Sequence, residues 1–231
     1  MGKLYDLLKQ DIRYQEALNA CINCGTCTAV CPAAEFYDYD PRRIVDDVQQ
    51  HDEAMLEKIL KSNQIWYCGE CMSCVTRCPR NNAPGMLIQA LRTLSQRTGY
   101  FTCSEKGRQQ LALKRTIGTW ILEHGYCVYP RNVKAERHPE AGLVWEWEQE
   151  HLDDVFDRLG GNLDKEGPGV LRKIPQESLD ELKRIFEVTG GMALYDAIER
   201  FSAEKAEELG MSPEEYVDHI FTHNSMNHGR E

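Results

Sequence analysis

The sequence predicts a mainly α-helical protein in two parts, and three observations lead to this prediction. Apolar residues recur at helical spacing along most of the 231-residue chain. Helix ends are marked by capping residues, such as Asp40 before Pro41, and by stop glycines, such as Gly99. Most of the cysteines fall into two short runs near the start of the chain. We therefore expect a cysteine-rich helical domain over residues 1–100 and an α-rich extension over residues 101–231.

Two copies of one cysteine run organise the first part. Each copy reads C-x2-C-x2-C-x3-C-P, which is the spacing of proteins that hold two [4Fe–4S] clusters. In this pattern the first three thiolates surround one cluster, while the residue before proline is extended and its thiolate reaches the other cluster. The sequence thus predicts two clusters with crossed ligands. One is held by Cys21, Cys24, Cys27 and Cys78, and the other by Cys68, Cys71, Cys74 and Cys31.

Disulfides and zinc are the competing interpretations of these cysteines. A disulfide framework belongs to oxidising compartments, but the N-terminus leads into a charged amphipathic stretch with no apolar signal core. Zinc sites use pairs of cysteines with longer spacers between them. The duplicated quadruplets therefore favour two [4Fe–4S] clusters, and the lack of a signal core favours a cytoplasmic protein.

The charge of the chain excludes some classes of partner. The net charge is −10, and the extension is the acidic part, with 16 basic and 25 acidic side chains after residue 100. An acidic surface repels phosphate backbones, so nucleic-acid binding is not expected. No apolar stretch is long enough to span a bilayer. Protein partners are the remaining expectation.

The cysteine-rich part is expected to form helices around its two runs. The apolar patterns and caps predict helices over residues 3–18, 41–50, 52–62 and 84–98. The 36 residues between the runs are thus mostly helical, which favours an α-helical ferredoxin domain over the β-rich small ferredoxins. Trp66 and Tyr67 are expected to shield a cluster from water. Arg42 and Arg43 stand in a first helical turn, either as solvated side chains or as cations beside a cluster.

The extension is expected to be α-rich, with little regular structure in its middle. Helices are predicted over 104–124, 152–159 and 192–209, and short strands over 126–129 and 143–147. Two more helices are predicted to open on capping boxes, which begin at Ser178 and Ser212. Two kinds of residue carry no assigned role. They are Cys103 and Cys127, expected to be buried structural thiols, and the histidines His219, His223 and His228, for which a frayed tail is expected rather than a metal site.

Residues 15–98 resemble the C subunit of heterodisulfide reductase and its relatives. The resemblance rests on the segments Leu18 to Cys27, Cys31-Pro32, Asp40 to Val45, and Ile65 to Arg80. It implies an α-helical ferredoxin fold, similar to the C-terminal half of the succinate dehydrogenase iron–sulfur subunit, that acts as an electron relay. In that family, electrons pass between a flavin-containing A subunit and a catalytic B subunit with cysteine-rich CCG motifs.

This chain departs from the other subunits of such complexes. It has no adjacent pair of cysteines and no dinucleotide-binding motif, so the catalytic clusters and the flavin are expected elsewhere. Methanogen-type members of the family are expected to stop largely after the ferredoxin unit. The extension therefore favours the type that serves sulfur oxidation. Two alternatives stay open, namely an iron–sulfur subunit of another dehydrogenase and a metal-stabilised interaction module without redox function.

Overall fold

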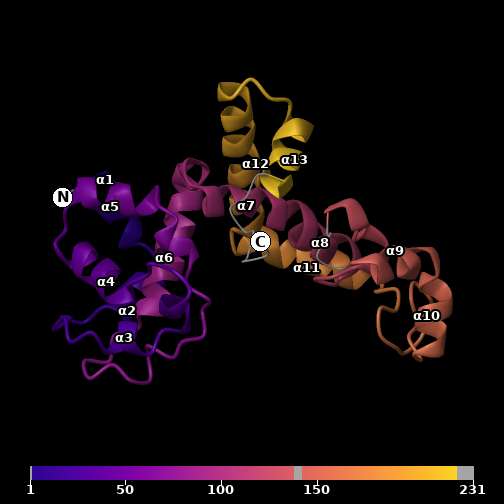
Figure 1. Cartoon of the computed structure of the whole chain (residues 1–231), viewed down its shortest axis with the longest axis horizontal. Helices are drawn as coiled ribbons and strands as arrows, with labels where there is room; N and C mark the ends of the chain where they lie inside the picture. The colour runs from indigo at the N-terminus through magenta and orange to yellow at the C-terminus, as the bar shows by residue number, and fades with distance from the viewer. Residues whose placement is uncertain (1, 138–141, 223–231) are drawn as a thin grey trace. The chain divides into compact units, whose positions relative to one another are not determined.

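The computed structural model describes residues 2–137 and 142–222 (Figure 1). Every regular element in these residues is a helix, which confirms the predicted mainly α class. The described residues form two compact units: unit 1 comprises residues 2–110 and 197–216, and unit 2 comprises 111–137, 142–196 and 217–222. The division at residue 100 into a ferredoxin domain and a docking extension stays a prediction. No helix in the described residues is long and apolar enough to cross a membrane.

Unit 1 contains the cysteine runs and a bundle of short helices. They are α1 (Lys3–Leu8), α2 (Ile12–Ala17), α3 (Thr26–Ala29), α4 (Pro41–Gln49), α5 (Glu53–Leu60) and α6 (Pro84–Thr98). Two 3-10 turns lie between them, η1 (Pro32–Glu35) and η2 (Gln64–Trp66), and a third, η3 (Tyr100–Cys103), follows α6. The predicted helices at 41–50, 52–62 and 84–98 are thus confirmed.

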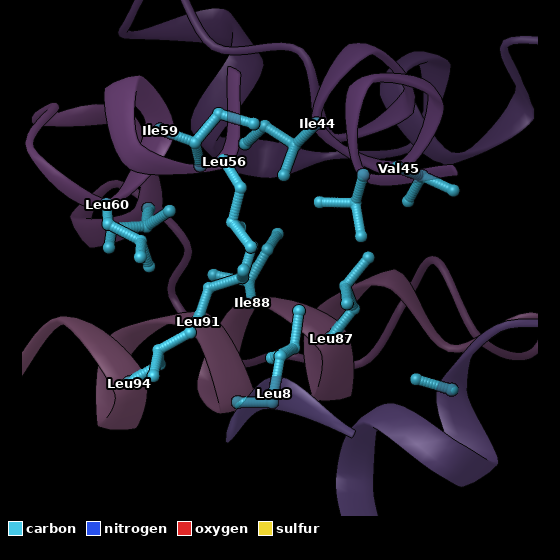
Figure 2. Close-up of a cluster of buried hydrophobic side chains, with 14 of the residues drawn as sticks. Leu8, Ile44, Val45, Leu56, Ile59, Leu60, Leu87, Ile88, Leu91 and Leu94 are labelled. Atoms are coloured by element: carbon cyan, nitrogen blue, oxygen red, sulfur yellow. The ribbon is translucent and has the colours of Figure 1, made fainter. Parts of the chain in front are cut away.

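The helix α6 provides one side of the apolar core of unit 1 (Figure 2). Its inward side chains are Leu87, Ile88, Leu91 and Leu94. The side chains that face them come from α4 and α5 and are Ile44, Val45, Leu56, Ile59 and Leu60. Full burial of one such side chain stabilises the fold by roughly 1.5–3 kcal/mol. The core therefore holds α6 firmly where its first turn meets the second cysteine run.

The predicted helix at 3–18 is wrong as a single element. The chain leaves α1 at Lys9 and starts again after Asp11. The reason is local, because the carboxylate of Asp11 accepts a hydrogen bond of 2.9 Å from the N–H of Arg13 and caps a new helix, α2. Asp40 and Asp52 cap α4 and α5 in the same way. Helix breaks in this unit thus follow aspartates that apolar spacing alone does not reveal.

The remaining helices lie beyond η3. They are α7 (Glu105–Leu113), which continues through a π turn, η4 (Lys114–Gly118), into α8 (Thr119–His124), and then α9 (Leu143–Glu150), α10 (Leu152–Arg158), α11 (Gln176–Val188), α12 (Gly191–Glu208) and α13 (Pro213–Thr222). The predicted helices at 104–124, 152–159 and 192–209 are confirmed. A small core in unit 2 packs Trp120 of α8 against Tyr129, Leu152, Leu163 and Leu171.

Several predictions for the extension are wrong. Residues 143–147 are the start of α9, and 126–129 form no strand, because a strand needs a neighbour to pair with and the described residues contain none. The helix α11 starts before Ser178, so this serine is no cap, whereas Ser212 and Glu215 do form a reciprocal capping box at α13. Cys103 and Cys127 are exposed rather than buried. Of the three histidines, His223 and His228 lie outside the described residues, and His219 lies in α13.

Candidate metal centres

The two cysteine loops have the same backbone geometry. In the first loop Asn23 and Gly25 adopt φ of 59° and 80°, and in the second loop Glu70 and Met72 adopt φ of 55° and 58°. These positions correspond, since each stands two or four residues after the first cysteine of its run. Left-handed backbone is unfavourable for residues other than glycine, so both loops hold a strained shape that the surrounding contacts must maintain. The sequence repeat is therefore a repeat of conformation.

A cavity in unit 1 joins the last cysteine of the first run to the second run. Its lining includes Cys31 together with Cys68, Cys71 and Cys74. Cys31 has φ of −82° and ψ of 116°, the extended conformation that a following proline imposes. These four sulfurs are the set that the sequence predicts for one cluster. The rest of the lining is largely apolar and includes Tyr39, Pro41 and Ile88.

The end of the second run lies beside the start of the first. The N–H of Ala83 donates to the carbonyl of Ala17 at 2.8 Å, and Nε of Arg80 donates to the carbonyl of Ala20 at 3.3 Å. Cys78 is thereby brought toward the first run, where its sulfur accepts a hydrogen bond of 3.3 Å from the N–H of Asn82. These contacts support the predicted grouping of Cys78 with Cys21, Cys24 and Cys27, which stays a prediction.

The two predicted cluster sites are neighbours. The pKa of the Cys27 thiol is raised to about 11, mainly by burial and in smaller part by the charges of Cys21 and Cys74, while main-chain hydrogen bonds lower it. Cys21 and Cys74 belong to different predicted sites, so Cys27 stands within electrostatic reach of both.

Both loops place a hydroxyl next to their second cysteine. The sulfur of Cys24 lies 3.4 Å from the hydroxyl of Thr26, and the sulfur of Cys71 lies 3.5 Å from that of Ser73. Hydrogen bonds with these hydroxyls and with the N–H groups of the same residues lower the pKa of each thiol. Lower pKa values favour the thiolate, which is the form that binds iron. Neither residue was singled out from the sequence.

Arg92 of α6 fastens the second loop from behind. Its guanidinium donates to the carbonyl of Ile65 at 2.7 Å, to the carbonyl of Cys68 at 2.5 Å and to the carboxylate of Glu70 at 2.5 Å. The side chain of Arg92 is 17% exposed. A half-buried cation beside the loop also offsets the negative charge that a thiolate-bound cluster brings.

Arg42 has the corresponding position at the first loop. It donates to the side-chain oxygen of Asn23 and, at 2.8 Å, to the carboxylate of Asp40. Asp40 in turn accepts a hydrogen bond from the hydroxyl of Thr28 in α3. Of the two interpretations considered for Arg42, the contact with Asn23 favours a role at the cysteine loop over simple solvation.

Tyr39 was not predicted as a site residue, yet it lines the cavity of the second site where Trp66 and Tyr67 do not. Its ring meets the ring of Tyr67 edge-on, with centroids 6.3 Å apart. Its hydroxyl is buried and has no hydrogen-bond partner. Burial strongly raises the pKa of this hydroxyl, and its interactions with the side chain of Cys68, by charge and by hydrogen bonding, and with the charge of Cys31 raise it further. The available sequence signal was only an aromatic residue just before the Asp40-Pro41 cap.

The residues present fit iron–sulfur clusters. Four thiols line one apolar cavity, and the first turn of α6 begins at its wall, where the N–H of Gly85 donates to the sulfur of Cys74 and lowers its pKa against the stronger effect of burial, which raises it. Helix N-termini stabilise negative charge. In the described part of the chain, no three His, Cys, Asp or Glu side chains converge closely enough for one metal ion. Cluster ligands stand farther apart, because each thiolate binds a different iron.

Comparison with known proteins gives two kinds of match. The family described as "4Fe-4S dicluster domain" matches residues 17–82, which include all eight cysteines of the two runs. Together with the two runs, this match shows that the chain holds two [4Fe–4S] clusters. Relatives that match over longer stretches are subunits of oxidoreductase complexes.

Three of these relatives come from methanogens. The C subunit of the ferredoxin:CoB-CoM heterodisulfide reductase of Methanosarcina acetivorans is 36% identical over 159 residues, which is 68% of this chain and 60% of the relative. The iron-sulfur C 2 subunit of the CoB–CoM heterodisulfide reductase of Methanocaldococcus jannaschii is 32% identical over 62% of this chain and 67% of the relative. The C subunit of the H(2):CoB-CoM heterodisulfide,ferredoxin reductase of Methanothermobacter thermautotrophicus is 23% identical over 175 residues, 76% of each chain.

The lengths of these matches correct one premise of the sequence analysis. A match of 175 residues to a methanogen protein reaches well past a ferredoxin unit of about 100 residues. Methanogen-type relatives therefore do not all stop after that unit. The presence of an extension in this chain does not separate the sulfur-oxidising type from the methanogen type.

Proposed function

This chain belongs to the family of heterodisulfide reductase C subunits, and on that premise we propose that it relays electrons through two [4Fe–4S] clusters between other subunits of an oxidoreductase complex. The observation that supports the relay best is the cavity where Cys31 joins Cys68, Cys71 and Cys74. It links the two cysteine runs into adjacent sites. When bound, the clusters accept and release single electrons.

The residues of this chain would hold the clusters and set their surroundings. Arg92 and Arg42 fix the two loops, and the hydroxyls of Thr26 and Ser73 stabilise thiolates at the exposed edge of each site. Cys24 and Cys71 are the exposed cysteines of their runs. We propose that electrons enter and leave at these two edges, because they are where a partner comes nearest to a cluster.

The flavin and the catalytic clusters would belong to partner subunits. This sequence contains neither adjacent cysteines nor a dinucleotide-binding motif. The proposed partners are a flavin-containing A subunit and a B subunit with CCG motifs, as the family resemblance implies. The proposed location is the cytoplasm, a reducing compartment that suits cysteines kept as thiolate ligands of clusters.

Residues 101–231 are proposed to dock these partners. The helix α9 presents three large apolar side chains to solvent, Leu143, Val144 and Trp147. Exposed apolar groups gathered on one short helix are typical of protein–protein contacts. Because the extension is acidic, we expect the partner surface that contacts it to carry basic residues.

Two metabolic settings remain for the complex. One is reduction of the CoB–CoM heterodisulfide, the substrate that the names of the relatives give. The other is cytoplasmic sulfur oxidation, proposed from the resemblance. Deletion of this chain in the source organism separates the two settings. If the deletion strain still oxidises thiosulfate normally, sulfur oxidation is excluded. If it loses thiosulfate oxidation but grows normally on organic carbon, reduction of the CoB–CoM heterodisulfide is excluded.

The relay is tested on the complex purified anaerobically through a tag on this chain. We expect about 8 iron atoms and about 8 acid-labile sulfides per chain. Dithionite should reduce both clusters, and an oxidising dye should reoxidise them in the absence of air. Co-purification of a flavoprotein and a CCG-motif protein supports the proposed partners. Zinc in place of iron, with no sulfide, would instead favour a metal-stabilised interaction module.

A further inference from the structure

The hydroxyl of Tyr39 is an unpaired hydrogen-bond donor in the wall of the second cluster site. Tyr39 is 3% exposed and lines the cavity with Cys31, Cys68, Cys71 and Cys74. No atom of the described residues accepts its proton in good hydrogen-bond geometry, and the side chain that interacts with it most strongly is that of Cys68. A buried polar group without a partner costs free energy of about 1–3 kcal/mol, so it calls for an explanation.

The chemistry of the site supplies an acceptor. A neutral thiol is a weak acceptor, whereas a thiolate carries negative charge and accepts hydrogen bonds well. Cys68 is the cysteine whose charge acts most strongly on this hydroxyl. The ring of Tyr39 contacts Tyr67 edge-on and lies in the wall of the cavity, which limits its movement away from the site. Its unpaired state is thus expected to end when Cys68 becomes a cluster ligand.

We infer that Tyr39 donates a hydrogen bond to the Cys68 thiolate of the bound cluster and thereby makes this cluster the easier of the two to reduce. This inference rests on the proposed ligation of that cluster. Reduction adds negative charge to the cluster and its sulfurs. A hydrogen bond to one of these sulfurs stabilises the reduced state more than the oxidised state and raises the reduction potential.

The first cluster site shows no matching donor at the corresponding place. Tyr39 stands eight residues after Cys31, and the residue eight after Cys78 is Met86, whose thioether cannot donate. Each loop has an arginine that is paired with a carboxylate, but Arg92 at the second loop is the more buried, with a side chain 17% exposed against 31% for Arg42 at the first loop. The hydroxyl of Tyr39 and the more buried arginine both raise the reduction potential of the second cluster relative to the first. An electron on this chain would therefore rest on the cluster of Cys68.

The test is a redox titration of the anaerobic holoprotein followed by electron paramagnetic resonance. Tyr39→Phe removes one oxygen and keeps the ring, so exclusion of water from the site is unchanged. We expect the higher of the two midpoint potentials to fall while the lower one stays. Loss of one hydrogen bond to a charged group changes the reduction equilibrium by on the order of tenfold, which is about 59 mV for a one-electron couple.

Tyr37→Phe is the matched control. Tyr37 lies two residues away and stacks on Tyr67 with centroids 4.4 Å apart, but it does not line the cavity. Its loss of a hydroxyl should leave both potentials in place. An equal shift in both variants would show a general effect of the aromatic group and overturn the role of Tyr39.

A second change works in the opposite direction. Incorporation of 3-fluorotyrosine at position 39 makes the phenol a stronger donor and should raise the same potential that Tyr39→Phe lowers. If both clusters are present and neither change at position 39 alters their midpoint potentials, the proposed hydrogen bond from Tyr39 is wrong, but the proposed electron relay is not affected. If the wild-type protein contains no acid-labile sulfide, or if its clusters cannot be reduced reversibly, the proposed electron relay is wrong. The two hypotheses therefore fail in different experiments.

Discussion

Arg92 donates a hydrogen bond of 2.5 Å to the main-chain carbonyl of Cys68. The contact joins the middle of α6 to the first ligand of the second cysteine run, over 24 residues of sequence. Because the same guanidinium also binds the carbonyl of Ile65 and the carboxylate of Glu70, the loop is fixed at three points by one side chain.

Arg92→Lys should loosen the second loop. Lysine keeps the charge but lacks the planar fork, so it cannot reach all three acceptors. We expect faster loss of iron from one cluster in the presence of a chelator, with a cost of roughly 1.5–3 kcal/mol for each charge-assisted hydrogen bond lost. Arg97→Lys, an exposed position on the same helix, is the control. Equal chelation rates in both variants would contradict the proposed function of Arg92.

Pairs of cysteine substitutions test the crossed ligands. Cys31→Ser combined with Cys68→Ser should remove one cluster and leave roughly four irons, because both residues are predicted to hold the same cluster. Cys31→Ser combined with Cys21→Ser should remove both. Iron and sulfide analysis decides between the patterns, with Cys103→Ser as a control outside the runs. The reverse pattern would refute the crossing of Cys31.

Substitutions at Gly99 and Gly210 distinguish the cost of backbone strain from the cost of a steric clash with a neighbouring side chain. Each of these glycines lies in unit 1 at the end of a helix and has a left-handed backbone, with φ of 81° at Gly99 and 70° at Gly210. A Cβ at Gly99 would lie 2.6 Å from the ring of Phe201, whereas a Cβ at Gly210 would meet nothing within 4 Å. Gly210→Ala should therefore cost about 1–2 kcal/mol, the conformational penalty alone.

Gly99→Ala should destabilise unit 1 by more than Gly210→Ala. The difference between the two, measured by anaerobic chemical denaturation, is the cost of displacing Phe201. Adding Phe201→Ala to Gly99→Ala should cancel part of that difference, as expected for residues in contact. Additive effects in the double variant would show that the two residues do not interact.

The cap of α2 should make stability depend on pH. Hydrogen bonds from the Arg13 side chain, opposed in part by burial, hold the pKa of Asp11 below its usual range. A carboxylate with a lowered folded-state pKa contributes stability that is present above the unfolded pKa of about 3.9 and is lost as the pH falls through the folded value.

Asp11→Asn keeps a capping oxygen but removes the charge. We expect it to cost about 1 kcal/mol at neutral pH, with the difference from wild type shrinking as the pH falls below about 4. Denaturation curves at several pH values measure it, and Asp6→Asn at an exposed position of α1 is the control. A difference that does not change with pH would assign the effect to the cap geometry and not to the charge.

The sequence by itself determined the two clusters and most of the helices. Cluster ligation depends on spacings of two or three residues and on prolines that act on their neighbours, such as Pro32 on Cys31, so these signals are local. The same holds for the stop at Gly99 and the cap at Asp40. The expected strand at 143–147 failed because a strand is not a local object and depends on a partner elsewhere in the chain.

Only the tertiary structure decided what surrounds the clusters. Arg92 reaches Cys68 from a helix that begins after the second run has ended, and Tyr39 reaches the same site from the segment that follows the first run. Neither residue has a spacing that marks it. Such contacts arise when α6 packs against α4 and α5, since burial of their apolar faces brings together side chains that are distant in sequence.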